Sequence, residues 1–181
     1  MTFQYNIDET DFLTFQLYTA SKSKNIKKRR LKNKIIVPIF YLAIGLFFFY
    51  LNNLLIAILF TLFAFAWYLL YPKWEKHFYV RHYKKFIQEN YKERLGRLVA
   101  IEFNNESIIA KDNGSESKII LTELEAFNEI PQAIYVKIKT GQSFIIPKSK
   151  IFKIDEIRLE IKTLASKLEI PYNDENDWEW K

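Results

Sequence analysis

Several residue types on which catalysis and cross-linking depend are scarce or missing from this chain of 181 residues. Cysteine is absent, which excludes disulfides, thiol nucleophiles and cysteine-based metal sites. The two histidines, His77 and His82, are five residues apart and so do not share a helix face as a metal pair would. No glycine-rich phosphate loop, HExxH motif or GxSxG motif is present. We therefore expect no cofactor, no metal and no enzyme, with a pair of carboxylates as the one catalytic option left open.

Charge is missing from one long stretch of the chain, residues 35–71. These 37 residues contain no Asp, Glu, Lys, Arg or His, and the polar pair Asn52-Asn53 divides them into residues 35–51 and 54–71. Each half would span about 26 Å as a helix, which is close to the thickness of a bilayer's hydrocarbon core. The pattern predicts a two-helix transmembrane hairpin with a very short turn.

Other interpretations of this stretch are less favourable. A buried hairpin in a soluble core would need more apolar surface around it than the charged remainder of the chain supplies. A single span of the whole stretch would reach about 55 Å, too long for one crossing. A cleaved signal peptide is disfavoured because the apolar run begins late, continues into a second run and lacks a small-x-small site. The absence of ionisable groups within the stretch favours an anchor over a transporter or ion pathway.

Small residues and prolines predict how the two helices pack and end. Ala57, Thr61 and Ala64 share one helix face, and Gly45 allows close approach from the other helix. Pro38 is expected in the first turn of the first helix, where proline costs little. Pro72 is expected to mark the exit of the second helix, where it can form a kink.

Basic residues flank the hairpin on both sides. Residues 22–34 carry eight basic residues and no acidic one, and residues 73–97 carry eight basic residues against three acidic ones. The positive-inside rule then places both termini in the cytoplasm, and the flanks should attract anionic lipid headgroups. Because residues 98–181 carry a net charge of −4, the overall +6 does not indicate a nucleic-acid partner. The membrane-interface basic flank comprises Lys27, Lys28, Arg29, Arg30, Lys32, Lys34, Lys73 and Lys76, and the interfacial aromatics are Trp67, Tyr68, Tyr71 and Trp74.

The remaining chain predicts a small antiparallel β domain capped by a helix. Residues 2–7 alternate as a short strand that needs a partner elsewhere, and Asp8 can cap a following helix. Six short strands and their turns predict a meander that curls into a small barrel or sandwich. The strands are expected at 97–103, 107–112, 116–121, 124–130, 133–139 and 142–146, with tight turns at Asn113-Gly114 and Thr140-Gly141. The apolar stripe of the closing helix is Ile154, Ile157, Ile161, Leu164 and Leu168, and Pro171 ends the helix.

These predictions divide the chain into five parts and give a membrane α+β fold class. The first part, 1–34, holds the cytoplasmic strand, helix and basic flank, and the second, 35–71, is the hairpin. Residues 72–95 form a basic amphipathic helix that either continues the second membrane helix or lies on the membrane surface. The β domain occupies 96–170, and 171–181 is expected to be a mobile tail.

The order of these parts resembles the YcxB-like family of bacterial membrane proteins. The resemblance rests on the strand and acidic helix start at Phe3–Asp11, on the hairpin, and on Phe144–Lys148 with Phe152 before the last helix. It implies a pleckstrin-homology-like C-terminal domain, which is a curled antiparallel sheet with one capping helix. The chain departs from the family pattern at Leu121–Leu124, where that pattern has a Trp leading into the fourth strand. The resemblance implies a fold and a location, the bacterial inner membrane, rather than an activity.

These features favour a membrane-anchored interaction or adaptor module with both termini in the cytoplasm. We expect a protein partner or self-association, because exposed strand edges can bind an extended peptide. The alternative is a lipid-headgroup or envelope sensor without enzymatic activity. Specific headgroup recognition is disfavoured by the turn Asn104-Asn105-Glu106, because pleckstrin-like domains that bind inositol phosphates carry basic residues near their first hairpin.

Overall fold

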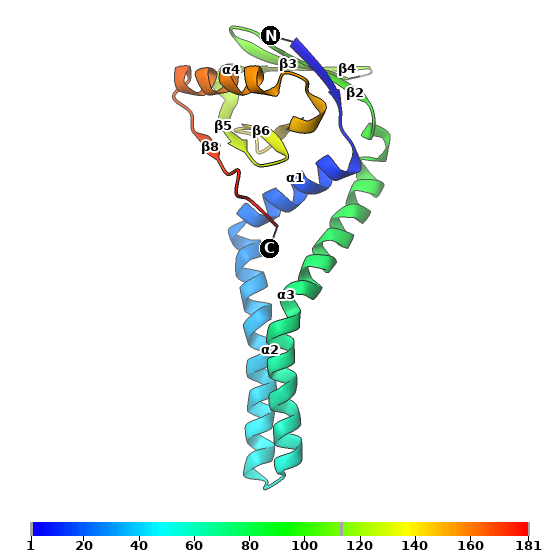
Figure 1. Cartoon of the computed structure of the whole chain (residues 1–181), viewed down its shortest axis with the longest axis vertical. Coiled ribbons are helices and arrows are strands. Elements are labelled where there is room, and N and C mark those ends of the chain that lie inside the picture. The colour runs from blue at the N-terminus through cyan, green and yellow to red at the C-terminus, as the bar shows by residue number, and fades with distance from the viewer. Residues whose placement is uncertain (1, 113, 181) are drawn as a thin grey trace. The chain divides into compact units, whose positions relative to one another are not determined.

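The computed structural model describes residues 2–112 and 114–180 (Figure 1). The chain divides into two compact units. The sheet unit contains the residues up to 15 and 84–179, and the hairpin unit contains 16–83 together with Trp180. Two of the boundaries fall inside helices, namely α1 (Glu9–Lys22) and α3 (Leu54–Asn90).

The hairpin unit is built from α2 (Lys24–Tyr50) and α3, which are separated by a short turn as predicted. Asn52 has a φ of 58°, a left-handed conformation that asparagine tolerates better than most residues. Asn53 then accepts a hydrogen bond from the Ile56 amide at 3.4 Å and caps α3. Both helices are long and apolar enough to cross a membrane.

Both helices extend beyond the uncharged stretch, which corrects the prediction for Pro38. α2 begins after Ser23, whose hydroxyl accepts a hydrogen bond from the Ile26 amide at 3.4 Å, so Pro38 lies inside the helix rather than in its first turn. Lysine and arginine are good helix formers, and the basic flank therefore continues the helix. Pro72 likewise lies inside α3, which runs on to Asn90. The basic segment after residue 72 thus continues the second apolar helix.

The predicted contact between small residues is confirmed. A Cβ atom added to Gly45 would lie 3.2 Å from the Ala57 carbonyl oxygen and 3.4 Å from the Thr61 hydroxyl. Ala57 and Ala64 are buried. Backbone-to-backbone approach of this kind is how small residues pack apolar helices together.

The sheet unit contains two four-stranded sheets. The first sheet has the order β1-β2-β3-β4 and is antiparallel throughout. The second has the order β7-β6-β5-β8, in which β8 pairs with β5 in parallel. All six strands predicted between residues 97 and 146 are present, within a few residues at each end, but they are shared between two sheets. The strands are β1 (Thr2–Asn6), β2 (Leu98–Phe103), β3 (Ser107–Asp112), β4 (Ser115–Ile120), β5 (Leu124–Glu129), β6 (Ala133–Ile138), β7 (Ser143–Pro147) and β8 (Tyr172–Asp174).

The N-terminal strand finds the partner that the sequence required. Tyr5 of β1 pairs with Val99 of β2, so the hairpin is inserted between two adjacent strands of one sheet. The Asp11 amide donates to the Asp8 carboxylate at 3.0 Å, and the Asp8 amide donates to the Asp11 carboxylate at 2.9 Å. This reciprocal cap starts α1 as predicted. Of the predicted Asn113-Gly114 turn, Asn113 lies outside the described residues, and Gly114 has a φ of +96°.

The closing helix is α4 (Ile154–Lys167), which buries its apolar stripe as predicted. Ile157, Ile161 and Ala165 join the core formed by the two sheets, together with residues such as Phe127 and Ile134. Glu169 follows the helix with a φ of 54°, and Pro171 leads into β8. The helix therefore covers sheet residues, which is the arrangement expected of a capped β domain.

The prediction of a mobile C-terminal tail is wrong for residues 172–176. Tyr172 and Asn173 pair with Phe127 and Asn128 of β5, and the Glu175 amide donates to the Glu129 carbonyl at 2.8 Å. The order β7-β6-β5 leaves one edge of β5 open, and unpaired backbone groups at that edge bind the returning chain.

Candidate functional site

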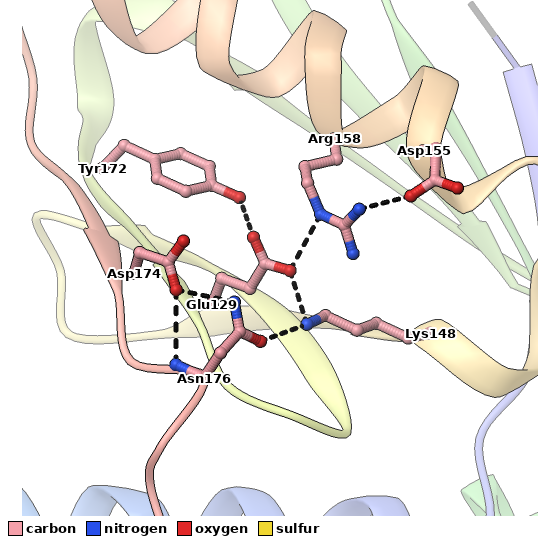
Figure 2. Close-up of polar contacts among 7 residues, drawn as sticks. All are labelled: Glu129, Lys148, Asp155, Arg158, Tyr172, Asp174 and Asn176. Carbon is pink, nitrogen blue, oxygen red and sulfur yellow. Dashed lines mark hydrogen bonds and ion pairs between the residues drawn. The ribbon is translucent and has the colours of Figure 1, made fainter.

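Glu129, the last residue of β5, is a carboxylate with no exposed surface. One of its oxygens, Oε1, lies 2.5 Å from the Lys148 ammonium nitrogen and accepts from Arg158 Nε at 2.9 Å. The other oxygen accepts a hydrogen bond from the Tyr172 hydroxyl (Figure 2). We call these four residues the Glu129 cluster. Two cations and one hydroxyl thus compensate for the burial of one negative charge, which would be costly without them.

The donors of the Glu129 cluster come from three different elements around sheet β7-β6-β5-β8. Lys148 begins η3 (Lys148–Lys150) directly after β7, Arg158 belongs to α4, and Tyr172 begins β8. Further contacts surround these donors (Figure 2). Arg158 also bonds the Asp155 carboxylate, Lys148 donates to Asn176 Oδ1 at 2.8 Å, and Asn176 Nδ2 donates to Asp174 Oδ1 at 2.6 Å.

The cluster holds Glu129 in its charged form. Burial alone would raise the pKa of Glu129, but the hydrogen bonds from Lys148, Tyr172 and Arg158 outweigh it and lower the pKa below its usual range. Burial and the nearby carboxylate raise the pKa of Tyr172, so its hydroxyl stays protonated and continues to donate. A carboxylate held ionised by three donors is a poor general acid or base. The cluster instead has a structural role, because its ion pairs and hydrogen bonds connect β5, α4 and the C-terminal segment.

A second buried carboxylate, Glu75, belongs to the hairpin unit and has 5 % of its surface exposed. Arg30 Nε on α2 donates to Glu75 Oε2 at 3.0 Å, and the Tyr71 hydroxyl donates to Oε1 at 3.0 Å. The Arg30 guanidinium also lies 4.6 Å from the centre of the Trp180 ring, a distance typical of a cation–π contact. This ion pair therefore joins α2 to α3 just beyond the uncharged stretch.

The structure divides the predicted interface residues between two surroundings. Of the aromatics, Tyr68 and Trp74 are exposed, whereas Tyr71 is buried and stacks on Trp67 with their ring centres 5.4 Å apart. Lys34 extends over the Tyr68 ring, with 4.6 Å between the ammonium and the ring centre. The basic flank lies on α2 at Lys27, Lys28, Arg29, Arg30, Lys32 and Lys34 and on α3 at Lys73 and Lys76; of these, Arg30 binds Glu75.

A hollow of about 450 Å³ is a third feature of the sheet unit. Ser115 and Ser117 on β4 line it, together with the basic residues Arg94, Arg97 and Lys111. Arg97 Nη1 lies 3.9 Å from an Asp112 oxygen, which offsets part of the positive charge. Its volume falls within the range of about 300 to 1,000 Å³ that is usual for small-molecule sites.

Sequence reasoning missed both buried carboxylates. A signal for Glu75 was present, because it is the only acidic residue between Asp11 and Glu89. Nothing local distinguishes Glu129, whose side-chain partners Arg158 and Tyr172 lie 29 and 43 residues away.

Within residues 2–112 and 114–180, no group of three or more His, Cys, Asp or Glu side chains is arranged to hold a metal ion. Comparisons with protein-family models, with curated proteins and with solved structures give no match to this chain.

Proposed function

We propose that this chain is a membrane-anchored interaction module that binds an extended segment of a partner protein along β4. The proposal includes membership of the YcxB-like family, insertion of the hairpin in the bacterial cytoplasmic membrane, and both termini in the cytoplasm. The two four-stranded sheets and α4 agree with the curled sheet and capping helix expected of a pleckstrin-homology-like domain.

The surface of the hairpin supports a membrane location over the soluble-core alternative. In the most apolar windows of α2 and α3, only 11 % and 17 % of the residues are buried. Large apolar side chains such as Leu46 and Leu55 are exposed. An apolar face of this extent needs a covering, and lipid supplies one for two helices without internal charge.

The open edge of β4 is the observation that carries the interaction proposal. β4 is the last strand of its sheet, and most of its residues are exposed. Over the described ranges, no backbone hydrogen bond joins β4 to a segment other than β3 and its adjoining turn. An exposed strand edge is a template for one more strand.

The register of β4 shows which backbone groups a partner strand would meet. The Leu121 amide donates to the Glu106 carbonyl at 2.9 Å, so this pair is a hydrogen-bonded one. Because hydrogen-bonded pairs alternate along an antiparallel ladder, the backbone groups of Glu116, Lys118 and Ile120 face away from β3. Their neighbours Ser115 and Ser117 line the hollow beside the strand. A bound strand would therefore use the outward backbone groups and could place a side chain in that hollow.

A proline at residue 118 tests this proposal. Lys118→Pro removes one outward amide without removing a bond to β3, whereas Lys118→Thr keeps that amide and serves as the control. A photo-crosslinking residue at Glu116 in the full-length protein in native membranes should yield a protein adduct that is retained in Lys118→Thr and lost in Lys118→Pro. The same crosslinker at Leu159, an exposed residue of α4, should not give that adduct. An adduct that forms equally from both positions, or that survives the proline in a protein with unchanged melting temperature, would contradict the proposal.

The hollow beside β4 favours lipid-headgroup sensing as the second candidate function. In the first sheet, the segment that connects β1 to β2 is the one that contains the hairpin. Arg94 and Arg97 lie at the end of this segment, directly before β2. The turn Asn104–Glu106, which lacks basic residues, is the second connection, so its composition does not argue against an anion site. Soluble glycerol phosphate should then bind the full-length protein and lose affinity in Arg97→Gln. Equal weak binding by both proteins would remove this candidate.

A further inference from the structure

Two hollows between α2 and α3 in the hairpin unit share Tyr71 and Trp74. The first, of about 310 Å³, is lined by apolar and aromatic side chains that include Phe63, Ala66 and Leu70. The second, of about 580 Å³, adds polar side chains. The two helices run side by side from the turn, and α3 then bends away from α2 (Figure 1). Pro72 lies inside α3, and a proline within a helix is a common cause of such a bend.

The polar hollow presents positive charge and amide groups from one face of α2. Asn25, Arg29 and Asn33 are four residues apart and therefore share that face. Over the described ranges, Arg29 has no carboxylate partner. The one acidic residue in the lining, Glu75, is already bound by Arg30 at 3.0 Å. The hollow is thus complementary to an anion.

The opposite wall is a continuous column of aromatic rings on α3. Ring centres lie 5.4 Å apart between Trp67 and Tyr71, 5.9 Å between Tyr71 and Trp74, and 5.7 Å between Trp74 and Phe78. This column crosses from the apolar hollow into the polar one. Aromatic side chains are favoured at the level of lipid headgroups, where an apolar region meets a polar one.

We propose that the two hollows form one site for a single anionic glycerophospholipid of the surrounding bilayer. Its phosphate would bind Arg29 with the amides of Asn25 and Asn33, and one acyl chain would lie along Phe63, Ala66 and Leu70. An amphiphile needs a polar region for its headgroup next to an apolar region for its acyl chain. The polar and apolar hollows share Tyr71, at which the uncharged stretch ends, and so provide both. Basic pockets between membrane helices on the cytoplasmic side are known to suit such headgroups.

Bound lipid of this kind differs from the general attraction of basic flanks to an anionic surface. General attraction depends on the number of charges and treats neighbouring lysines and arginines alike. Binding of a lipid in a specific site depends instead on the particular residues that line the site. Lys28 is adjacent to Arg29 on the same helix and does not line either hollow, so it provides a control of equal charge.

Native mass spectrometry of the full-length protein tests the site. Phosphatidylglycerol and phosphatidylcholine with identical acyl chains are added to the protein in detergent micelles. One phosphatidylglycerol should be retained per chain, in preference to phosphatidylcholine. Arg29→Gln should weaken its retention roughly tenfold or more, because it removes the charged donor that would bind the phosphate. Lys28→Gln should leave retention within about twofold of the unmodified protein, because its charge does not line the hollows.

Filling the apolar hollow gives an independent measurement. Ala66→Phe should reduce retention of phosphatidylglycerol, whereas Leu62→Phe, at an exposed position outside the lining, should not. Equal retention of both lipids, equal loss in Arg29→Gln and Lys28→Gln, or a dimer without bound lipid would each overturn the proposal. Unchanged melting temperatures of the variants ensure that a loss of lipid is not a loss of fold.

Discussion

Glu129 and Glu75 are both buried carboxylates that bind an arginine, but the structure holds them in different ways. Glu129 receives donors from three elements of the sheet unit, and each donor is far away in the sequence. Glu75 receives one bond from Tyr71, one helical turn before it, and one from Arg30 on the facing helix. The side chain of Arg30 keeps 21 % of its surface exposed.

This difference indicates how each unit would respond to losing its carboxylate. Without Glu129, Lys148 would lose the carboxylate that it binds while its side chain is only 13 % exposed, whereas Arg158 would keep its contact with Asp155. Without Glu75, a single arginine at the end of the apolar stretch could turn its long side chain toward water or headgroups. The Glu129 cluster should therefore matter more for stability than the Glu75 pair.

The largest effect is expected for Glu129→Ala. Removing one partner of a buried ion pair typically costs about 3 to 5 kcal/mol, because the remaining charge, here that of Lys148, loses its compensation. The free energy of opening should fall by about that amount for β5 and β8, as measured by hydrogen exchange of the full-length protein in detergent. Glu125→Ala provides the control, because its ion pair with Lys137 is exposed and should contribute at most about 1 kcal/mol. Equal changes in the two variants would contradict this view of the cluster.

Acid should weaken the same region, and this sharpens the assignment to Glu129. The pKa of Glu129 is lower in the folded chain than the ordinary value of 4.5, so the unfolded chain takes up its proton first as the pH falls. The stabilisation by Glu129 is therefore fully present above the unfolded pKa and is lost as the pH falls through the folded pKa. Glu129→Gln, which has no proton to bind, should lose less stability than the unmodified protein on acidification below about pH 4.5. Thermal unfolding followed at a series of pH values measures both slopes, and parallel slopes would contradict the assignment.

Patterns that repeat locally were predictable from the sequence. The uncharged stretch with its polar pair predicted both long helices and the turn, and alternation predicted β1 and the six strands up to β7. The three-residue strand β8 was not predictable, because only the open edge of β5 makes Tyr172–Asp174 a strand. For the same reason, no local pattern identifies Glu129 as a buried ion.

In the hairpin, too, contacts that follow from local spacing were predictable and contacts between distant residues were not. The contact of Gly45 with Ala57 and Thr61 was predictable because helical spacing alone places small residues on a common face. The pairing of Arg30 with Glu75 was not, since 45 residues separate them and the sequence presents Arg30 as one of many flanking cations. The position predicted for Pro38 was wrong because the good helix formers that precede it, such as Lys32 and Lys34, are part of α2.

A smaller effect is expected for Glu75→Ala. We expect a loss of about 1 to 3 kcal/mol, below that of Glu129→Ala, because Arg30 can reach polar surroundings after losing its partner. The change should be confined to hydrogen exchange of α2 and α3 near these residues. Glu89→Ala is a suitable control, since its ion pair with Lys85 is exposed on both sides. A loss as large as that of Glu129→Ala would break the distinction between the two carboxylates.

The smallest effect is expected in the coupling of Trp180 to Glu75 through Arg30. Trp180 is 6 % exposed, and its ring packs edge-on against Tyr79 with 5.5 Å between ring centres. Trp180→Leu therefore removes this ring contact, part of the apolar volume and the cation–π contact. That contact is expected to contribute about 1 kcal/mol. Because Arg30 binds both Glu75 and the Trp180 ring, the effects of the two substitutions on stability should not be additive. The loss of stability caused by Trp180→Leu should differ by at least about 0.5 kcal/mol, in either direction, between the unmodified protein and Glu75→Ala. Strict additivity, measured by thermal unfolding of the four proteins, would mean that Arg30 does not couple the ring to the carboxylate.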